Sequence, residues 1–367
     1  MERRSFLKKA GIGAVAGTAA FAAPAIAESN PKINWKMTST YGPSLPALFG
    51  TAQLFVKMVE EATGGNFSIR LYPAGEIVPG FEVMDAVGNG TVEAGQTASY
   101  YFYGKDPSFS FDTAVPFGLN ARQLDAWMFE GDGLTLMREL FATRNIVNFP
   151  FGNTGTQMGG WYRKEINSIE DLKGLKMRTA GFAGEVLARL GVVPQQVPPG
   201  DIYPSLEKGT LDAVEFVGPV DDEKLGFHKV AKYYYYPGWW EGSAQVSLYI
   251  NDEAFASLPP QYQAVVATCA RAASNKMLTM YDSQSPAALR RLMAAGAVLK
   301  AFPRDVMDAS FEASNQLYKE FCDKDPMFKK IHDNYMGFRD EVVPWFRVAE
   351  GSFDNYIGLA LANRRRS

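Results

Sequence analysis

Apolar and polar residues follow two different periods in the first part of the chain. Residues 33–38 and 67–72 alternate like half-buried strands, whereas Leu48, Ala52, Phe55 and Val59 recur at helical spacing within 44–62. Gly64 and Gly65 end that helix, and 81–87 has the pattern of a short helix. This β-α-β-α order predicts an α/β fold with a mostly parallel sheet and helices on its faces.

A second alternation of the same kind follows between residues 158 and 215. Residues 182–190 form a predicted helix that stops at Gly191, 192–197 a strand, and 202–208 a helix that stops at Gly209. From residue 259 the apolar periodicity is helical, at 262–281, 287–293 and 306–321. We therefore predict an N-terminal α/β domain (28–151, with later segments crossing back), a second α/β domain (152–258), and a C-terminal helical region (259–367) that acts as lid, hinge and dimerisation element.

One internal repeat links the two halves. The sequence G-T-V-E-A-G-Q at 90–96 is echoed by G-T-L-D-A-V-E at 209–215. In each copy a glycine is expected to end a helix, a short strand follows, and a polar residue, Gln96 or Glu215, stands where the strand ends. If the two domains face each other, both polar residues are expected to point into a shared cleft.

The first 27 residues have the pattern of an export signal. Arg3 and Arg4 precede a small apolar run that closes with A-P-A-I-A, which is typical of a twin-arginine signal cleaved after Ala27. The run is too short and too rich in alanine and glycine to favour the alternative, a membrane anchor. Removing this segment takes away four positive charges and one negative charge, so the net charge changes from −3 to −6. The sequence predicts a periplasmic protein whose partners do not include nucleic acid.

Three polar side chains are placed where apolar strands meet small or glycine-rich sequence. Asn153 and Gln157 follow the run 146–150, and Arg178 follows the run 175–177. The carboxyl ends of strands are where α/β sheets bind small molecules, and a guanidinium matches a carboxylate with two parallel hydrogen bonds. We expect Arg178 to bind an anion in a cleft between the two domains.

Two acidic residues accompany this arginine in the sequence pattern. Glu215 ends the predicted strand 213–216, and Glu241 follows the aromatic run Y-Y-Y-Y-P-G-W-W. Two carboxylates beside a bound anion would repel it unless a cation lies between them or the pair holds a proton. Oxygen donors, including the Gln157 amide, favour calcium or sodium. Spacing alone also allows two unrelated solvated acids or a carboxylate pair for hydrolysis.

Other chemistry finds little support in the residues. The chain has no G-x-S-x-G, H-E-x-x-H or C-x-x-C motif and only two histidines, His228 and His332, far apart in sequence. Tyr100 is the first of a group of tyrosines after the first copy of the repeat, so one hydroxyl could reach the cleft. The spacing of the two cysteines, Cys269 and Cys322, leaves a disulfide open.

Six motifs give the chain a resemblance to a known family. They are G-K-D-P-S-F (104–109), G-N-T-G-T-Q-M-G-G-W (152–161), G-L-K-M-R (174–178), L-G-V-V-P-Q-Q (190–196), G-D-I-Y-P-S-L-E-K-G-T-L-D-A (200–213) and Y-Y-Y-Y-P-G-W-W-E-G (233–242). Over essentially its whole length the chain resembles the solute-binding subunit of tripartite ATP-independent periplasmic (TRAP) transporters of the DctP type, in the branch that binds 2-oxo acids.

The resemblance implies a two-domain clamshell that closes on a small organic anion and presents it to a membrane permease. It implies that Arg178 binds the ligand carboxylate, that Asn153 and Tyr100 hydrogen-bond the ligand, and that one cation is held as well. The cation ligands it implies are Gln157, Glu215, Glu241 and the main-chain carbonyl of Phe216.

The resemblance also implies a non-enzymatic homodimer, built through the C-terminal helices, that binds pyruvate or another 2-oxo acid. Phe216 departs from the family, in which similar proteins have Trp, so the pocket wall is altered. A 2-hydroxy acid such as lactate and a periplasmic carboxylate-pair hydrolase are the alternatives.

Overall fold

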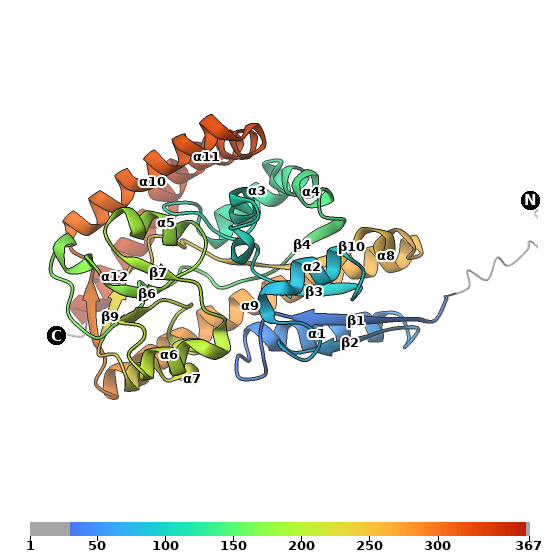
Figure 1. Ribbon diagram of the computed structural model, residues 1–367, viewed down its shortest axis with the longest axis horizontal. Coiled ribbons are helices and arrows are strands. Elements are labelled where there is room, and N and C mark those ends of the chain that lie inside the picture. The colour runs from blue at the N-terminus through green and yellow to red at the C-terminus, as the bar shows by residue number, and fades with distance from the viewer. Residues whose placement is uncertain (1–29, 365–367) are drawn as a thin grey trace, which may run out of the picture. The chain divides into compact units, whose positions relative to one another are not determined.

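Two mixed β-sheets organise residues 30–364, the part of the chain that the computed structural model describes (Figure 1). The first sheet has the strand order β2-β1-β3-β10-β4 and contains β1 (Ile33–Ser39), β2 (Phe67–Tyr72), β3 (Ala94–Thr97), β4 (Ile146–Asn153) and β10 (Gln245–Asn251). The second has the order β11-β9-β5-β8-β6-β7 and contains β5 (Trp161–Tyr162), β6 (Lys176–Arg178), β7 (Val193–Gln195), β8 (Ala213–Val214), β9 (Tyr233–Tyr236) and β11 (Val298–Ala301). The predicted signal peptide at 1–27 lies outside the described residues.

The helices of the described residues lie between and around these strands (Figure 1). The α-helices are α1 (Leu48–Ala62), α2 (Val83–Gly88), α3 (Ala121–Glu130), α4 (Gly133–Ala142), α5 (Phe182–Arg189), α6 (Ile202–Glu207), α7 (Pro219–Leu225), α8 (Asp252–Ala256), α9 (Pro260–Ala294), α10 (Arg304–Lys324), α11 (Pro326–Phe346) and α12 (Ser352–Arg364). Short 3₁₀ turns are η1 (Gly80–Glu82), η2 (Ser99–Phe102), η3 (Pro107–Asp112), η4 (Ile169–Leu172), η5 (Pro199–Asp201) and η6 (Phe227–Lys229), and a π turn, η7 (Arg347–Gly351), joins α11 to α12. The α/β class with a long helical C-terminal element is confirmed.

One strand in each sheet runs against the predicted parallel direction. β1 is parallel to both β2 and β3, but β10 is antiparallel to β3 and β4. In the second sheet β5 is antiparallel to β8 and β9, whereas β6 is parallel to β7 and β8. The expectation of a mostly parallel sheet is confirmed, with β10 and β5 as the antiparallel exceptions, since local periodicity does not show pairing between segments as distant as β4 and β10.

The chain crosses between the sheets three times, the last time through α9 to β11, and the first two crossing segments are hydrogen-bonded to each other. After β4 the chain enters β5 of the second sheet, and after β9 it returns to the first sheet as β10. The Thr154 amide donates to the Ala244 carbonyl (3.0 Å), and the Gln157 amide donates to the Glu241 carbonyl (3.1 Å). Gln157 and Glu241 are therefore paired on the first two of the three connections between the sheets. The domain boundaries predicted from the sequence stay a prediction.

Helix α9 is a long helix that packs against several other elements of the fold. It has 35 residues and continues through Pro286, where the sequence pattern predicted two separate helices. Its buried residues, among them Val266, Ala270 and Met277, lie on one side, and the helix contacts α1, β4 and α7 (Figure 1). Pro286 is exposed, so water can satisfy the carbonyl that loses its helical partner there.

Helix α1 covers the first sheet with the apolar face that the sequence predicted. Leu48, Ala52, Phe55 and Val59 are buried along one face, which packs against β2 and α9. Burying such side chains contributes roughly 1.5–3 kcal/mol for each large one. The predicted periodicity of this helix is confirmed, although it begins at Leu48 rather than at residue 44.

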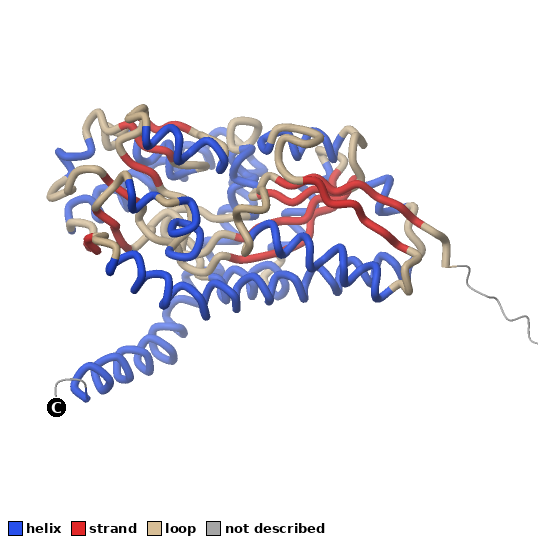
Figure 2. Tube along the Cα trace, turned by 90° about the horizontal axis from the view of Figure 1, so that it is seen from below, coloured by secondary structure: helices blue, strands red, loops and turns tan. Residues whose placement is uncertain are grey.

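The C-terminal helices end in an exposed segment (Figure 2). No residue of α12 is buried, and Phe353, Tyr356 and Leu359 are each more than 60% exposed. Within residues 30–364 no helix is both long and apolar enough to cross a membrane. Cys269 in α9 and Cys322 in α10 are free thiols, so the disulfide left open by the sequence is not formed.

Candidate functional site

Arg178, the last residue of β6, is a fully buried guanidinium at a strand end of the second sheet. Its Nη1 donates to the Glu215 side-chain Oε1 at 2.6 Å and to the Glu215 carbonyl at 2.7 Å. Its Nη2 is buried and has no hydrogen-bond partner. Because an unpaired buried donor is costly, this nitrogen is suited to receive an anionic group from outside the protein.

Glu215 directly follows β8, and its position depends on the neighbouring glycine. One carboxylate oxygen accepts from Arg178, while the other, Oε2, is buried without a partner. Gly160 has φ of +86°, and a Cβ added there would lie 2.5 Å from the Val214 carbonyl oxygen and 3.1 Å from the Glu215 Cβ. Only glycine therefore lets the first crossing segment approach this closely.

Glu241 and Gln157 contribute two more unpaired oxygens from the crossing segments. Glu241 is 3% exposed, and its Oε2 has no hydrogen-bond partner. The Gln157 side-chain nitrogen donates to Thr154 Oγ1 at 3.1 Å, which leaves the amide oxygen Oε1 unpaired and buried. The predicted side-chain ligands of the cation thus carry three orphaned oxygen atoms, one each.

The electrostatics of the site show that its carboxylates hold protons readily. Burial raises the pKa of Glu215 to about 7, although Arg178 opposes the shift. Burial and then the charge of Glu215 raise the pKa of Glu241 well above its ordinary value. Burial disfavours the Arg178 charge, but Glu215 and the surrounding tyrosines and Glu241 more than compensate, so the pKa of Arg178 is raised. One arginine and two buried glutamates leave one negative charge to be neutralised by a proton or a cation.

A small cavity borders these groups, and its lining comes from both sheets and from the crossing segments. Its residues are Tyr41, Leu48, Ala98, Tyr100, Tyr101, Thr154, Gln157, Phe216, Val217, Ala244 and Val246. The Phe216 ring lies against the guanidinium of Arg178, 5.4 Å from its central carbon. The structure therefore brings Gln157 and Phe216 together with the predicted ligand residue Tyr100, next to Arg178.

Tyr100 reaches this cavity from the 3₁₀ turn η2 after the first sheet. Burial, followed by the negative charge of Glu241, raises the pKa of Tyr100 well above its ordinary value, so its hydroxyl is a stable donor. Gly181, with φ of +59°, lies against Tyr100: an added Cβ would be 2.9 Å from the Tyr100 Cβ. The start of α5 in the second-sheet region therefore packs directly on η2.

Asn153 lies apart from the other predicted ligand residues. Its Oδ1 accepts from the Gly155 amide at 2.9 Å, and its side chain lines a larger groove with residues of α3 and α9 such as Asp125 and Arg271. That groove, about 650 Å³, does not share the cavity lining described above. The local geometry gives the predicted ligand contact of Asn153 no support.

The internal repeat is confirmed as a unit, but its two polar ends have different roles. Both copies follow a short helix, contain a glycine at positive φ (Gly90 and Gly209) and lead into β3 or β8. Gln96, however, is buried within β3, where its side chain accepts from Ser39 Oγ at 2.8 Å and donates to the Leu48 carbonyl at 2.8 Å. The prediction that Gln96 points into the cleft was wrong, because its amide is satisfied inside the first sheet.

Sequence reasoning missed several groups that hold the site in place. Tyr41 lines the cavity two residues after β1, so the strand-end rule used for Arg178 would have found it. Asp112 is fully buried and accepts hydrogen bonds from Ser247 Oγ (2.5 Å), Asn148 Nδ2 (2.9 Å) and Ser99 Oγ, thereby fixing η2 and Tyr100. No local pattern marks such an acid, because its partners come from three distant segments.

The donor set fits a hard cation. Three buried oxygens without partners, from one amide and two carboxylates, match the all-oxygen coordination of calcium or sodium, and no sulfur or imidazole is among these predicted ligands. A cation supplies positive charge for two carboxylates and for a ligand carboxylate.

The chain matches the family described as bacterial extracellular solute-binding protein, family 7 (DctP) over residues 38–325. The monocarboxylate 2-oxoacid-binding periplasmic protein of Nostoc sp. strain PCC 7120 is 44% identical over 97% of this chain and 99% of its own. A TRAP transporter solute-binding protein from Bordetella bronchiseptica RB50, a dimer with copurified calcium and picolinate bound, is 51% identical with a TM-score of 0.90, over 91% of this chain and 99% of its own.

A third relative is the TRAP periplasmic solute-binding protein of Pseudoalteromonas atlantica T6c, solved with bound sodium and pyruvate. It is 38% identical with a TM-score of 0.86, over 88% of this chain and 99% of its own. The family match, the two-sheet fold and these full-length similarities lead to one conclusion: the chain belongs to the DctP family of TRAP transporter solute-binding proteins.

Proposed function

We propose that this protein binds a small 2-oxo monocarboxylate such as pyruvate in the periplasm and delivers it to a TRAP membrane permease. The observation that carries the proposal is the set of orphaned polar atoms: Arg178 Nη2 and one oxygen each of Gln157, Glu215 and Glu241, all buried. The Arg178 nitrogen can donate a hydrogen bond to a ligand carboxylate, and the three oxygens can coordinate a cation. The relatives named for 2-oxo acids, or solved with pyruvate and picolinate, support this ligand class.

In this proposal Arg178 binds the ligand carboxylate, and Gln157, Glu215, Glu241 and the Phe216 carbonyl hold one cation that the carboxylate also touches. Tyr100 and Asn153 are the proposed hydrogen-bond partners of the ligand. Pyruvate and picolinate both carry a second donor atom one carbon away from the carboxylate, so both can chelate a cation. Tyr100 is supported by its place on the cavity, whereas Asn153 would have to release its bond to Gly155.

Charge balance favours calcium over sodium. Arg178, two ionised glutamates and a ligand carboxylate sum to two negative charges, which a divalent ion neutralises and a monovalent ion does not. Unneutralised buried charge is costly. Lactate, the 2-hydroxy alternative, offers the same chelating pair of atoms, so the site chemistry alone does not separate it from pyruvate.

Calorimetric titration of the ligand-stripped protein with pyruvate tests the proposal. The protein is stripped by partial unfolding and dialysis into a sodium-free buffer, and is then titrated with no metal, with calcium, and with sodium. We expect saturable binding that requires one of the cations. Lactate and a dicarboxylate such as succinate serve as matched controls for ligand class.

The same samples also test whether the protein is a binding protein rather than an enzyme. Chromatography of the mixture after long incubation should return pyruvate unchanged. Metal-independent binding would remove the cation from the proposal, and a new product would favour the hydrolase or another enzymatic alternative.

We also propose that the chain is exported by the twin-arginine route and forms a homodimer. The dimer is supported by the exposed apolar side chains of α12 and by the dimeric Bordetella relative. Sedimentation of the mature protein should give twice the monomer mass, and deleting 352–364 should give the monomer. The intact mass of protein recovered from the periplasm should begin at Glu28, and export should fail in a strain without the twin-arginine translocase.

A further inference from the structure

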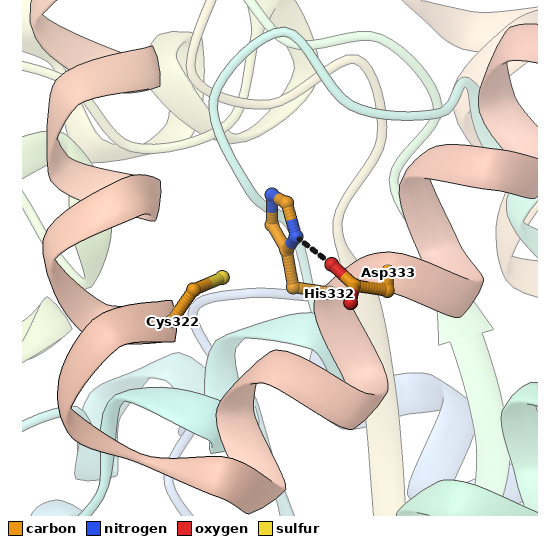
Figure 3. A group of neighbouring side chains, drawn as sticks. All are labelled: Cys322, His332 and Asp333. Carbon is orange, nitrogen blue, oxygen red and sulfur yellow. Dashed lines mark hydrogen bonds and ion pairs between the residues drawn. The ribbon is translucent and has the colours of Figure 1, made fainter.

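A second group of metal-ligating side chains, none of them a residue of the candidate ligand site, lies on the helical hairpin of α10 and α11 (Figure 3). Cys322 is near the end of α10, and His332 and Asp333 are in the second turn of α11. One potential ligand atom from each of the three residues lies within 4.8 Å of the others. Figure 3 shows the thiol and the carboxylate on either side of the imidazole.

We propose that Cys322, His332 and Asp333 form a binding site for a divalent transition metal of the zinc type. Thiolate and imidazole are ligands that zinc prefers, whereas calcium and sodium prefer oxygen alone. Two protein ligands on one tetrahedral zinc are about 3.3–3.6 Å apart, given metal–ligand bonds of about 2.0–2.3 Å. The three side chains therefore need to close by only about 1 Å, which side-chain rotation supplies.

The histidine and the aspartate are already held in a suitable arrangement. His332 Nδ1 lies 3.1 Å from Asp333 Oδ1, close to the separation expected of two ligands on one ion. The other carboxylate oxygen, Oδ2, accepts from Lys329 one turn earlier, so Oδ1 remains for a metal. The imidazole is packed between aromatic rings, with its centroid 5.4 Å from that of Tyr318 and 6.2 Å from that of Phe328. Such packing lowers the entropy lost on binding.

The site is open to ions from solution. Cys322 and His332 are half-buried, and both line a surface groove of about 350 Å³. Two cationic neighbours in that groove are already paired with other acids: Lys319 with Asp323 at 2.6 Å, and Arg339 with Asp340 at 2.9 Å. Three protein ligands leave one tetrahedral position for water.

A metal explains the cluster better than redox chemistry of the cysteine does. The neighbours of the Cys322 thiol are the imidazole of His332 and the carboxylate of Asp333, which are metal ligands and not a second thiol. The other cysteine, Cys269, is buried in α9 and is not paired with it. A bound metal would deprotonate the thiol and link the end of α10 to α11.

Cobalt(II) is the probe that reports the thiolate directly. The mature protein is first saturated with calcium and pyruvate, so that the hard-cation site is occupied, and is then titrated with cobalt(II). We expect a thiolate-to-cobalt charge-transfer band in the near ultraviolet and strong visible bands of a four-coordinate ion. One equivalent of zinc should remove both sets of bands. This inference stands apart from the proposed function, and its failure would leave the pyruvate measurements unaffected.

Variants assign the site to its residues. Cys322→Ser should abolish the charge-transfer band, whereas Cys269→Ser, the matched control, should keep it. His332→Gln and Asp333→Asn each remove a ligand, so each should raise the cobalt dissociation constant by at least the roughly 10- to 100-fold that loss of an outer-shell partner costs. Circular dichroism and pyruvate affinity should match those of the wild type, which shows that each variant is folded. The absence of a thiolate band in the wild type, or a band that persists in Cys322→Ser, would overturn the proposal.

Discussion

Glu241→Gln removes one buried negative charge from the site while it preserves the shape of the side chain. Without a cation, the single charge of Arg178 offsets only one of the two buried carboxylates, and burial, followed by the charge of Glu215, raises the pKa of Glu241 well above its ordinary value. The ligand-free wild type therefore keeps a proton on this pair at neutral pH. We expect the variant to be as stable as the wild type, because the neutral amide replaces a carboxyl that is already protonated.

Cation-dependent binding should respond differently. Two unit charges 4 Å apart in a partly buried site interact with about 4 kcal/mol, and part of this is lost in the wild type because Glu241 must first release its proton. We therefore expect Glu241→Gln to weaken calcium binding by about 2–4 kcal/mol, which corresponds to a rise in the calcium dissociation constant of roughly 30- to 900-fold. Calcium affinity in the presence of saturating pyruvate is the quantity to measure.

Proton release provides the decisive readout. Calorimetry in two buffers of different ionisation enthalpy counts the protons displaced when calcium and pyruvate bind at pH 7.5. The wild type should release up to about one proton, and Glu241→Gln markedly fewer. Gln157→Glu is the opposite control, since it adds a charge to the same donor set. A Glu241→Gln variant with wild-type affinity and wild-type proton release would show that Glu241 neither holds the proton nor binds the cation.

The other predictions concern Arg178, Gly160 and two buried acids at the start of α7, Asp221 and Asp222. Arg178→Met should weaken pyruvate binding by about 2–5 kcal/mol, roughly 30- to 5,000-fold, because the carboxylate loses its charged partner; titration calorimetry measures this, and unchanged affinity would remove Arg178 from the site. Gly160→Ala should lower the free energy of unfolding in urea by at least about 2 kcal/mol. Gly174→Ala is the matched control, because Gly174 is also at positive φ but has no atom within 4 Å of the new Cβ, and it should lower the free energy of unfolding by only about 1 kcal/mol. Equal losses would contradict the close contact between Gly160 and Val214. Burial raises the pKa of Asp221 and Asp222 to about 7, so between about pH 4 and 7 the folded state holds protons that the unfolded chain has lost. The stability that these two groups contribute is therefore complete below about pH 4 and is lost as the pH rises through about 7. Urea unfolding of the ligand-free protein should show this loss, and a free energy of unfolding that rises from about pH 5 to 8 would contradict it.

The sequence predicted the local elements well where one face of an element is buried. β2 (Phe67–Tyr72) was predicted with the same bounds, and β1 with its last residue missing, because their apolar positions alternate against a core. The length of α9 could not be predicted, because the effect of Pro286 depends on whether its face of the helix meets solvent or protein. The antiparallel direction of β5 and β10 escaped prediction for a similar reason, since pairing between distant segments leaves no local signal.

The residues of the candidate site could likewise be predicted only in part. Arg178, Glu215 and Glu241 could be selected because each follows an apolar or aromatic strand, and the structure brings their charges together. Gln96 obeys the same strand-end rule yet is satisfied inside the first sheet, and Asn153 faces another groove. Whether a polar side chain is left with an unpaired atom depends on neighbours from other segments, which only the folded arrangement supplies.

A crystal structure of the mature protein with calcium and pyruvate, measured with X-rays at which calcium scatters anomalously, tests the central claim most directly. We predict one anomalous peak with oxygens of Gln157, Glu215 and Glu241 at about 2.3–2.6 Å, and a pyruvate carboxylate that contacts both the ion and Arg178. Pyruvate bound to Arg178 with no ion between the two glutamates, or a calcium ion bound elsewhere, would contradict it.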